Sequence, residues 1–435
     1  MLIQSIYTYI FSRGENFYLF NSLSGLFCEI SKKTFIALYE HSYSTLDNDT
    51  IEFFKEKNVL IPNEEKYLYY LESKTQFNMA MAANTELGLI LIPTTHCNFN
   101  CPYCFESKHD TLSMTDEVED QLFNFISKHE NSKSIKLTWY GGEPLLGINR
   151  IKSIWKRLQK ECPDKPVTNH SIVTNGYLIN EDVINFFQES HLDSIQITLD
   201  GEINNHNKTR CLKSGEPTFE RIFNNILRLA ANLPSTEIIV RVNINRENLG
   251  DYTSVEKRIK MEGRNNIYVY PGFIREDCKD GCNFCYNTIS NGRDYYNFVK
   301  QANGNGSKLE CYPSNDGAKG CIMSSINSYI IGPQGEIYKC WNDIGYKDRI
   351  VSYIQNKNKG HRLRLVRYLS ETSPFSDSQC KDCYVFPICK GGCGHYRYRN
   401  KYEKGRFNLC TPFKDQMVLE SSLLDSINNC QKNSN

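Results

Sequence analysis

The segment "LILIPTTHCNFNCPYCFE", residues 89–106, joins an apolar run to three closely spaced cysteines. Its first four residues are apolar, which is typical of a strand buried in a parallel sheet. Cys97, Cys101 and Cys104 follow within a few residues, so we expect them at the C-terminal end of that strand. Clustered thiols in a chain without a secretion signal indicate a metal site more often than disulfides.

The same strand pattern recurs downstream, and helical patterns separate the recurrences. Further strands are predicted at residues 135–139, 171–174, 195–199, 238–242 and 267–270. Strands that alternate with helices predict a parallel sheet, and six such units favour an α/β fold built as a partial (β/α)6 TIM-like barrel. A doubly wound sheet is the alternative. In a barrel, chemistry takes place at the C-terminal ends of the strands, where the cysteines are expected.

Composition excludes several classes of protein. Lys and Arg number 51 against 50 acidic residues, so no net charge attracts nucleic acid or a membrane surface. The first residues lack the features of a signal peptide, and no stretch approaches the roughly 18 apolar residues of a spanning helix. We therefore expect a cytoplasmic protein. Most of the 18 cysteines are clustered, and those expected to be small buried side chains are Cys28, Cys162, Cys211 and Cys430.

Two kinds of metal site fit the first three cysteines. Three thiolates can bind three irons of a [4Fe–4S] cluster and leave the fourth iron open, whereas His96 could complete a tetrahedral zinc site. The segment "WYGGEPLL", residues 139–146, follows at the end of the second predicted strand. Its paired glycines allow close approach to a bound molecule, and Glu143 offers a carboxylate to an ammonium group. Alone, this segment would also fit a turn with a surface acid.

Together the two segments resemble the cofactor site of the radical S-adenosylmethionine (SAM) enzymes. The resemblance implies a catalytic set of Cys97, Cys101, Cys104 and Glu143 and a cluster whose open iron binds SAM, which is cleaved to a 5′-deoxyadenosyl radical. The SAM contacts that it implies are Tyr103, Gly141, Gly142, Glu143, Pro144, Thr174, Asn175, Thr198, Asp200 and Asn243. Asn175 and Asp200 fit turn positions equally well. His206 and Arg210 resemble a segment common in members with extra clusters, although a surface position also suits His206.

A second cysteine pattern occupies the C-terminal quarter of the chain: Cys321-x13-Gly335-x4-Cys340, then Cys380-x2-Cys383-x5-Cys389-x3-Cys393-x16-Cys410. It resembles the SPASM auxiliary domain, which carries up to two further [4Fe–4S] clusters, and a pair of zinc knuckles is the alternative. The resemblance implies one cluster on Cys380, Cys383, Cys389 and Cys410. It implies another on Cys321, Cys340 and Cys393, with Cys311 as the expected fourth ligand.

A third group of cysteines lies between the two patterns. Cys278, Cys282 and Cys285 repeat the first spacing, but no Gly-Gly-Glu-Pro segment follows them. They fit an auxiliary ligand, a separate zinc site or a redox-active group in a connector.

Many members of this subgroup modify peptides, so the implied function is maturation of a ribosomally made precursor peptide, for example by a thioether cross-link. Anaerobic sulfatase maturases, which form formylglycine, are the alternative. They commonly place Asp directly after the cysteine that matches Cys340, where this chain has Trp341, so their general base would be absent or displaced to Asp343. A non-enzymatic iron–sulfur carrier is disfavoured because it needs no half-ligated cluster or adenosine pocket. A zinc-dependent nucleic-acid binder is disfavoured because charge is balanced and the cysteine region has no basic stripe interleaved with aromatic residues.

The first 85 residues are expected to form a separate module. Strands at 6–11 and 17–20, helices near 32–39 and 50–57, and a short strand in "NVLIP" are consistent with a small winged-helix domain. It resembles modules that bind leader peptides. We expect strand addition beside residues 6–11 or 17–20, where Tyr7, Tyr9, Phe17 and Tyr18 offer apolar surface, with a structural cap as the alternative.

The predicted domains are the module (1–85), the barrel (86–275), a connector (276–310), the auxiliary domain (311–413) and a C-terminal helix or tail (414–435). The expected partners are a leader-bearing peptide or protein substrate and a reducing donor such as flavodoxin or ferredoxin, with neither nucleic acid nor membrane.

Overall fold

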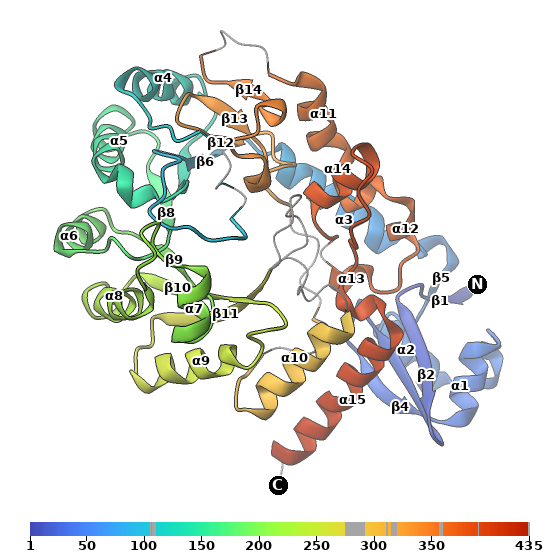
Figure 1. The fold of residues 1–435 in the computed structure, drawn as a ribbon. Coiled ribbons are helices and arrows are strands. Elements are labelled where there is room, and N and C mark those ends of the chain that lie inside the picture. The colour runs from blue at the N-terminus through green and yellow to red at the C-terminus, as the bar shows by residue number, and fades with distance from the viewer. Residues whose placement is uncertain are drawn as a thin grey trace.

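A nine-stranded sheet forms the centre of the protein, in the order β11-β10-β9-β8-β7-β6-β12-β13-β14 (Figure 1). The computed structural model describes residues 1–104, 106, 110–274, 292–309, 312–314, 320–355, 360–389 and 391–433. Neighbouring strands from β11 to β12 run parallel, whereas β13 and β14 are antiparallel additions at one edge. Within these described parts of the chain, no helix is long and apolar enough to cross a bilayer.

The six predicted β/α units and the partial barrel are confirmed. The strands are β6 (Glu86–Leu91), β7 (Ser134–Trp139), β8 (Val167–Thr174), β9 (Ser194–Leu199), β10 (Glu237–Ile244) and β11 (Ile267–Phe273). The helices between and after them are α4 (Asp116–Ser127), α5 (Ile148–Glu161), α6 (Glu181–Glu189), α7 (Ile203–Thr209), α8 (Phe219–Asn232) and α9 (Asp251–Met261). Most of these helices lie along the outer side of the sheet (Figure 1).

The two faces of the parallel sheet differ in character, as the alternation of side chains along a strand dictates. Leu87, Leu89 and Leu91 of β6 belong to the same buried cluster as the apolar side of α4. On the opposite face, between β7 and β8, the hydroxyls of Thr138 and Ser171 lie 2.8 Å apart. The polar inner face suits a cavity that receives a polar ligand.

Three short strands of the C-terminal part lie outside the predicted elements: β12 (Ser328–Ile331), β13 (Glu336–Tyr338) and β14 (Ser352–Tyr353). β12 pairs in parallel with β6, the strand that leads into the first three cysteines. Gly335 turns the chain from β12 to β13 with a φ of 79°, a left-handed conformation that favours glycine. The auxiliary region thus begins as a continuation of the barrel sheet.

Further helices belong to the C-terminal part of the chain, and those at residues 292–304 and 416–433 are longer than the rest. They are α10 (Gly292–Gly304), α11 (Arg362–Glu371), α12 (Ser378–Lys381), α13 (Phe386–Cys389), α14 (Gly394–Tyr402) and α15 (Gln416–Asn433). In Figure 1, α10 and α15 lie side by side at the end of the molecule that also carries the N-terminal strands.

The N-terminal module contains the predicted hairpin, both helices and the short strand. Its elements are β1 (Leu2–Gln4), β2 (Thr8–Arg13), β3 (Asn16–Asn21), β4 (Phe27–Ile30), α1 (Lys32–Tyr39), α2 (Asn48–Glu56), β5 (Leu60–Pro62) and α3 (Leu68–Ala82). β4 pairs with β3 from Phe17 to Phe20, and β2 pairs with the other side. The expected strand addition beside residues 17–20 is therefore wrong, because that strand already has two neighbours.

The aromatic side chains of this hairpin are also not free to bind a peptide. Phe11, Tyr18 and Phe20 form a buried cluster with side chains from α13 and α15. The hydroxyl of Tyr9 donates to Glu420 at 2.8 Å, and Tyr7 is only 2% exposed. The expectation that Tyr7, Tyr9, Phe17 and Tyr18 surround an open edge fails for three of them, since they pack within the protein.

Candidate active site

The three-cysteine loop lies at the C-terminal end of β6, as predicted. Cys97, Cys101 and Cys104 are all half-buried, and the backbone N–H of Cys104 donates to the carbonyl of Cys101 at 3.1 Å. A second bond, from Asn100 N to Cys211 O at 3.1 Å, holds the loop against the segment after α7. The loop curls back on itself, so its thiols gather in one place.

The pKa values of these thiols report their proximity. Burial raises the pKa of Cys101 to about 11 and that of Cys104 to about 12, and Cys97 adds to both shifts. The Arg210 guanidinium lowers the pKa of Cys101 against this trend. The structure therefore brings the three expected ligands together beside a permanent positive charge. Thiols bind metal only after losing their protons, so any metal that this loop held would have to displace protons from it.

The paired glycines allow two backbone segments to pack closely together. A Cβ on Gly141, whose φ is 139°, would lie 2.3 Å from the carbonyl oxygen of Thr94, and one on Gly142 would lie 2.4 Å from that of His96. Glu143 N donates to His96 O at 2.7 Å. The glycines thus let the end of β7 lie directly against the backbone that leads into the cysteines, and their close approach to a bound molecule stays a prediction.

Glu143 links the ends of two strands. Its carboxylate is fully buried and accepts hydrogen bonds from Leu145 N at 3.0 Å, Thr174 Oγ1 at 2.6 Å and Asn175 N at 2.7 Å. Burial raises its pKa, and these three donors oppose the rise. The contact of Glu143 with an ammonium group stays a prediction. The hydrogen bonds show a structural role, because they connect the end of β7 to the end of β8. Pro144, also buried, begins the short helical turn that follows.

Tyr103 is the centre of a hydrogen-bond network that joins three strand ends. Its hydroxyl donates to Asp200 Oδ2 at 2.5 Å and accepts from Arg210 at 2.9 Å and from Asn243 Nδ2 at 3.2 Å. Asp200 and Asn243 follow or end the neighbouring strands β9 and β10. The sequence-predicted residues of the cysteine loop, β9 and β10 therefore meet at one point.

Two polar atoms in this network have no hydrogen-bond partner among the described residues. Asp200 Oδ1 and Arg210 Nε are both buried and unpaired. Buried polar atoms nearly always find partners, so an orphaned acceptor and an orphaned donor at the same strand ends indicate a missing polar ligand. SAM carries hydroxyl donors and a carboxylate acceptor, so the residues present fit this cofactor.

The remaining expected SAM contacts lie at the same edge of the sheet. Thr174 and Asn175 are buried at the end of β8, where Asn175 Nδ2 donates to Asn98 Oδ1 at 2.8 Å, and Thr198 is half-buried on β9. His206 is fully buried, with its ring nitrogens 3.3 Å from Asp200 N and 3.0 Å from Thr218 Oγ1. The surface position considered for His206 is therefore wrong.

Cys211 belongs to the surroundings of the site rather than to an isolated core position. It is half-buried and adds to the raised pKa of Cys101. In the sequence, only its position next to Arg210 indicated that Cys211 lies near Cys101.

The seven cysteines of the second pattern divide into two sets by their mutual effects. Burial raises the pKa of Cys321, with Cys393 adding to it, and burial raises that of Cys340, with Cys393 and Cys321 adding. In the other set, burial raises the pKa of Cys380 to about 11, and Cys389 and Cys383 raise those of both Cys380 and Cys410 further. The sets agree with the implied cluster assignment, and ligation itself stays a prediction. Cys311, Cys278, Cys282 and Cys285 lie outside the described residues.

Asp343 is not placed to act as a displaced general base. It is completely buried, accepts a hydrogen bond from the Tyr368 hydroxyl at 2.8 Å and pairs with Arg349 at 3.4 Å. Burial raises its pKa to about 6, and these partners oppose the rise. We read Asp343 as a structural group, so among the described residues the base position after Cys340 is filled only by Trp341.

Trp341 itself lies next to the Gly-Gly-Glu segment. Its ring meets that of Tyr140 edge to face, with centroids 4.2 Å apart, and Tyr140 directly precedes Gly141. The auxiliary region therefore contacts the candidate SAM segment through this aromatic pair. No sequence motif predicted this contact.

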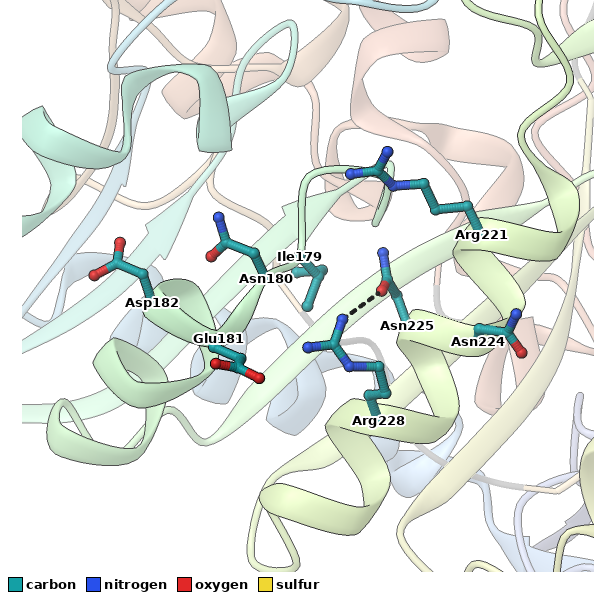
Figure 2. Close-up of a pocket in the computed structure, with 8 residues that line it drawn as sticks. All are labelled: Ile179, Asn180, Glu181, Asp182, Arg221, Asn224, Asn225 and Arg228. Atoms are coloured by element: carbon teal, nitrogen blue, oxygen red, sulfur yellow. Dashed lines mark hydrogen bonds between the residues drawn. The ribbon is translucent and has the colours of Figure 1, made fainter.

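A groove on the outside of the barrel lies apart from all of these residues. It runs between α6 and α8 and is lined by Ile179, Asn180, Glu181, Asp182, Arg221, Asn224, Asn225 and Arg228 (Figure 2). Asn225 Nδ2 donates to Gly176 O at 2.8 Å, which ties α8 to the turn after β8. None of the expected ligands lines this groove, so it has no part in the candidate site.

Comparison with known proteins agrees with this geometry. Residues 91–254 match the Radical SAM superfamily. The chain is 23% identical to the radical SAM cyclopropyl synthase TigE of Paramaledivibacter caminithermalis, over 90% of this chain and 89% of TigE. It is 24% identical to a cysteine-type anaerobic sulfatase-maturating enzyme of Clostridium novyi, over 75% of this chain and 93% of that enzyme.

Solved structures show the same fold. Native anSMEcpe with bound AdoMet and Cp18Cys peptide aligns with a TM-score of 0.61 at 21% identity, over 80% of this chain and 100% of that one. Streptococcus suis SuiB bound to S-adenosylmethionine aligns with a TM-score of 0.50 at 14% identity, over 94% of this chain and 99% of that one. The chain therefore contains a radical SAM domain, which implies SAM and a [4Fe–4S] cluster, and the relatives that it resembles are radical SAM enzymes.

Proposed function

We propose that the protein is a radical SAM maturase that modifies a ribosomally made peptide. One [4Fe–4S] cluster is held by Cys97, Cys101 and Cys104, and two more are held by the auxiliary cysteines. The observation that carries the proposal is the convergence at one sheet edge of three thiols and the orphaned polar atoms of Asp200 and Arg210.

The chain's own residues bind and orient SAM. When bound, the cluster and SAM supply a carbon-centred radical that removes an unactivated hydrogen atom. Asp200 offers a free acceptor to a hydroxyl group, and Arg210 offers a free donor to a carboxylate. Tyr103 holds both side chains in place through its hydroxyl. The burial of this network keeps water out, which strengthens each of these polar contacts.

A peptide substrate is supported by the N-terminal module and by the relatives. The module makes up about a fifth of the chain, so a match to TigE over 90% of the chain necessarily extends into it. The aligned structure of anSMEcpe contains a peptide, Cp18Cys. The polar inner face of the barrel, with Thr138, Ser171 and Gln196, offers partners for peptide carbonyl and amide groups.

Leader binding, if it uses strand addition, is confined to the outer edges of the module's three-stranded sheet. β3 lies in the middle, so β2 and β4 are the edge strands among the described elements. Edge strands with unpaired backbone groups are the usual sites of strand addition. We assign the leader to one of these edges and the electron supply to an external reduced flavodoxin or ferredoxin.

Formation of formylglycine on a sulfatase is the second candidate function. It is favoured by the match to sulfatase-maturating enzymes over 93% of the Clostridium novyi protein. Trp341 after Cys340 and the buried ion pair of Asp343 speak against it, because no carboxylate among the described residues is then placed as the base that follows Cys340.

Reaction of the reconstituted full-length enzyme with two peptides separates these functions. One peptide is encoded by a short reading frame beside the gene, and the other is a sulfatase fragment with the cysteine to be converted. We expect SAM-dependent modification of the first, detected by mass spectrometry, and slower reaction when its leader is removed. An aldehyde in the second peptide, detected with a hydrazide reagent, would establish the sulfatase function instead.

A further inference from the structure

We propose that Arg397 sets the reduction potential of the auxiliary cluster on Cys380, Cys383, Cys389 and Cys410. The inference rests on the proposed presence of this cluster. It concerns a residue that neither the cysteine pattern nor the candidate active site includes.

The position of Arg397 follows from its hydrogen bonds. It lies on α14, is 5% exposed, and donates to Asp377 and to the carbonyl of Gly391, the latter at 2.7 Å. Asp377 caps α12, the helix that carries Cys380, and Gly391 lies two residues after Cys389. The guanidinium thus bridges the two segments that bring these cysteines together.

Two opposite charges lie next to the helix that carries Cys380. Arg397 forms an ion pair with Asp377, whose carboxylate caps the start of α12. A guanidinium keeps its proton at any ordinary pH, so its charge does not depend on titration. Arg397 therefore stabilises negative charge at this site.

A second observation, independent of charge, also points to a ligand. Arg397 Nε is buried and has no acceptor among the described residues, although its two terminal nitrogens are both bonded. Buried donors without partners are rare in native proteins. We assign a cluster sulfur as the acceptor of this N–H.

The effect on redox chemistry has a defined sign. Uptake of one electron makes the cluster one unit more negative, and a buried cation that also donates to sulfur stabilises that reduced state. Arg397 therefore raises the reduction potential, and Asp377 lowers it. Lys414 donates to Cys383 Sγ at 3.3 Å, but it is exposed, so water and salt screen its charge.

The test is a redox titration of the reconstituted full-length protein, followed by electron paramagnetic resonance. It uses a background in which Cys97, Cys101 and Cys104 are replaced by Ala, so that only auxiliary clusters contribute. We expect Arg397→Gln to shift one midpoint to lower potential and Asp377→Asn to shift the same midpoint to higher potential. A tenfold change in the ratio of reduced to oxidised cluster corresponds to about 59 mV for one electron.

Three comparisons make the result decisive. Arg364→Gln, which removes an arginine bonded to Tyr368 and Glu403, should leave the midpoint unchanged, and Lys414→Gln should shift it less than Arg397→Gln. If Arg397→Gln loses iron, the shift in Asp377→Asn decides alone. Unchanged midpoints, or shifts in the same direction in both variants, would overturn the role of Arg397. Fewer than about eight irons per chain in the background protein would instead refute the auxiliary clusters themselves.

Discussion

Replacement of Glu143 by Ala should lower the stability of the folded protein, and any loss of SAM binding should follow from that. The carboxylate accepts three hydrogen bonds in a fully buried setting, two of them from the backbone N–H groups of Leu145 and Asn175. A hydrogen bond to a charged group contributes about 1.5–3 kcal/mol, so leaving the two backbone donors unpaired costs about 3–6 kcal/mol. That is a large part of a typical stability of about 5–15 kcal/mol.

The assay separates this structural loss from a loss of cofactor contact. Thermal unfolding of the reconstituted, SAM-free protein measures the structural term, and equilibrium dialysis with SAM measures binding. We expect a clear fall in the unfolding temperature of Glu143→Ala, and weaker SAM binding as its consequence. Thr174→Val, which removes only one donor to the same carboxylate, should cost about 1.5–3 kcal/mol.

One result would refute this reasoning. If Glu143→Ala unfolds within about 1 °C of the unaltered protein, a difference that corresponds to about 1 kcal/mol for a chain of this length, the carboxylate does not link the ends of β7 and β8. Weakened SAM binding at unchanged stability would then assign Glu143 to the cofactor's ammonium group alone.

Three further predictions follow from other parts of the structure. Cys101→Ala should abolish formation of 5′-deoxyadenosine and remove about four irons per chain, leaving the auxiliary irons in place; undiminished product would contradict the ligand assignment. The buried His170, whose pKa is lowered to about 4 by burial and whose Nε2 accepts from Trp139, is neutral when folded, so stability should fall by about 3 kcal/mol as pH drops from about 6.5 towards 4. Urea unfolding of His170→Gln should show a flatter pH dependence, and an equal slope would exclude this group. Removal of residues 1–80 should lower auxiliary iron content, because Ser22 Oγ and Tyr67 OH donate to Tyr384 O and Asp382; full iron retention would show that the module contributes nothing to that site.

The barrel was predictable because its strands and helices carry strong periodic patterns of apolar residues. α3 escaped prediction because only Tyr70 and Phe77 are buried along its fifteen residues, which leaves little periodic signal. β12 and β14 are short, and β12 finds its partner β6 more than 200 positions away, a pairing that no local pattern encodes. β4 escaped for a similar reason, and its absence from the prediction led to the wrong edge for strand addition.

The candidate site likewise combines features that local motifs predict with features that only the fold creates. Cysteine spacing and the Gly-Gly-Glu-Pro segment predicted where the candidate site lies in the fold, because these are local motifs. The network around Tyr103 and the contact of Trp341 with Tyr140 join residues from distant segments, so only the folded chain reveals them. The function of the two glycines also became clear only in three dimensions, since the backbone that they accommodate belongs to another loop.

The continuous sheet from β11 to β14 has a consequence for the motion of the enzyme. β6 leads into the cysteines of the barrel, and β13, two strands away, leads into Cys340. Domains joined by a linker can swing apart, but these two regions share backbone hydrogen bonds from Gly88 to Leu91, which must break before they separate. The ends of β6 and β13, which lead into the barrel thiols and Cys340, are therefore held at a spacing that the sheet itself fixes.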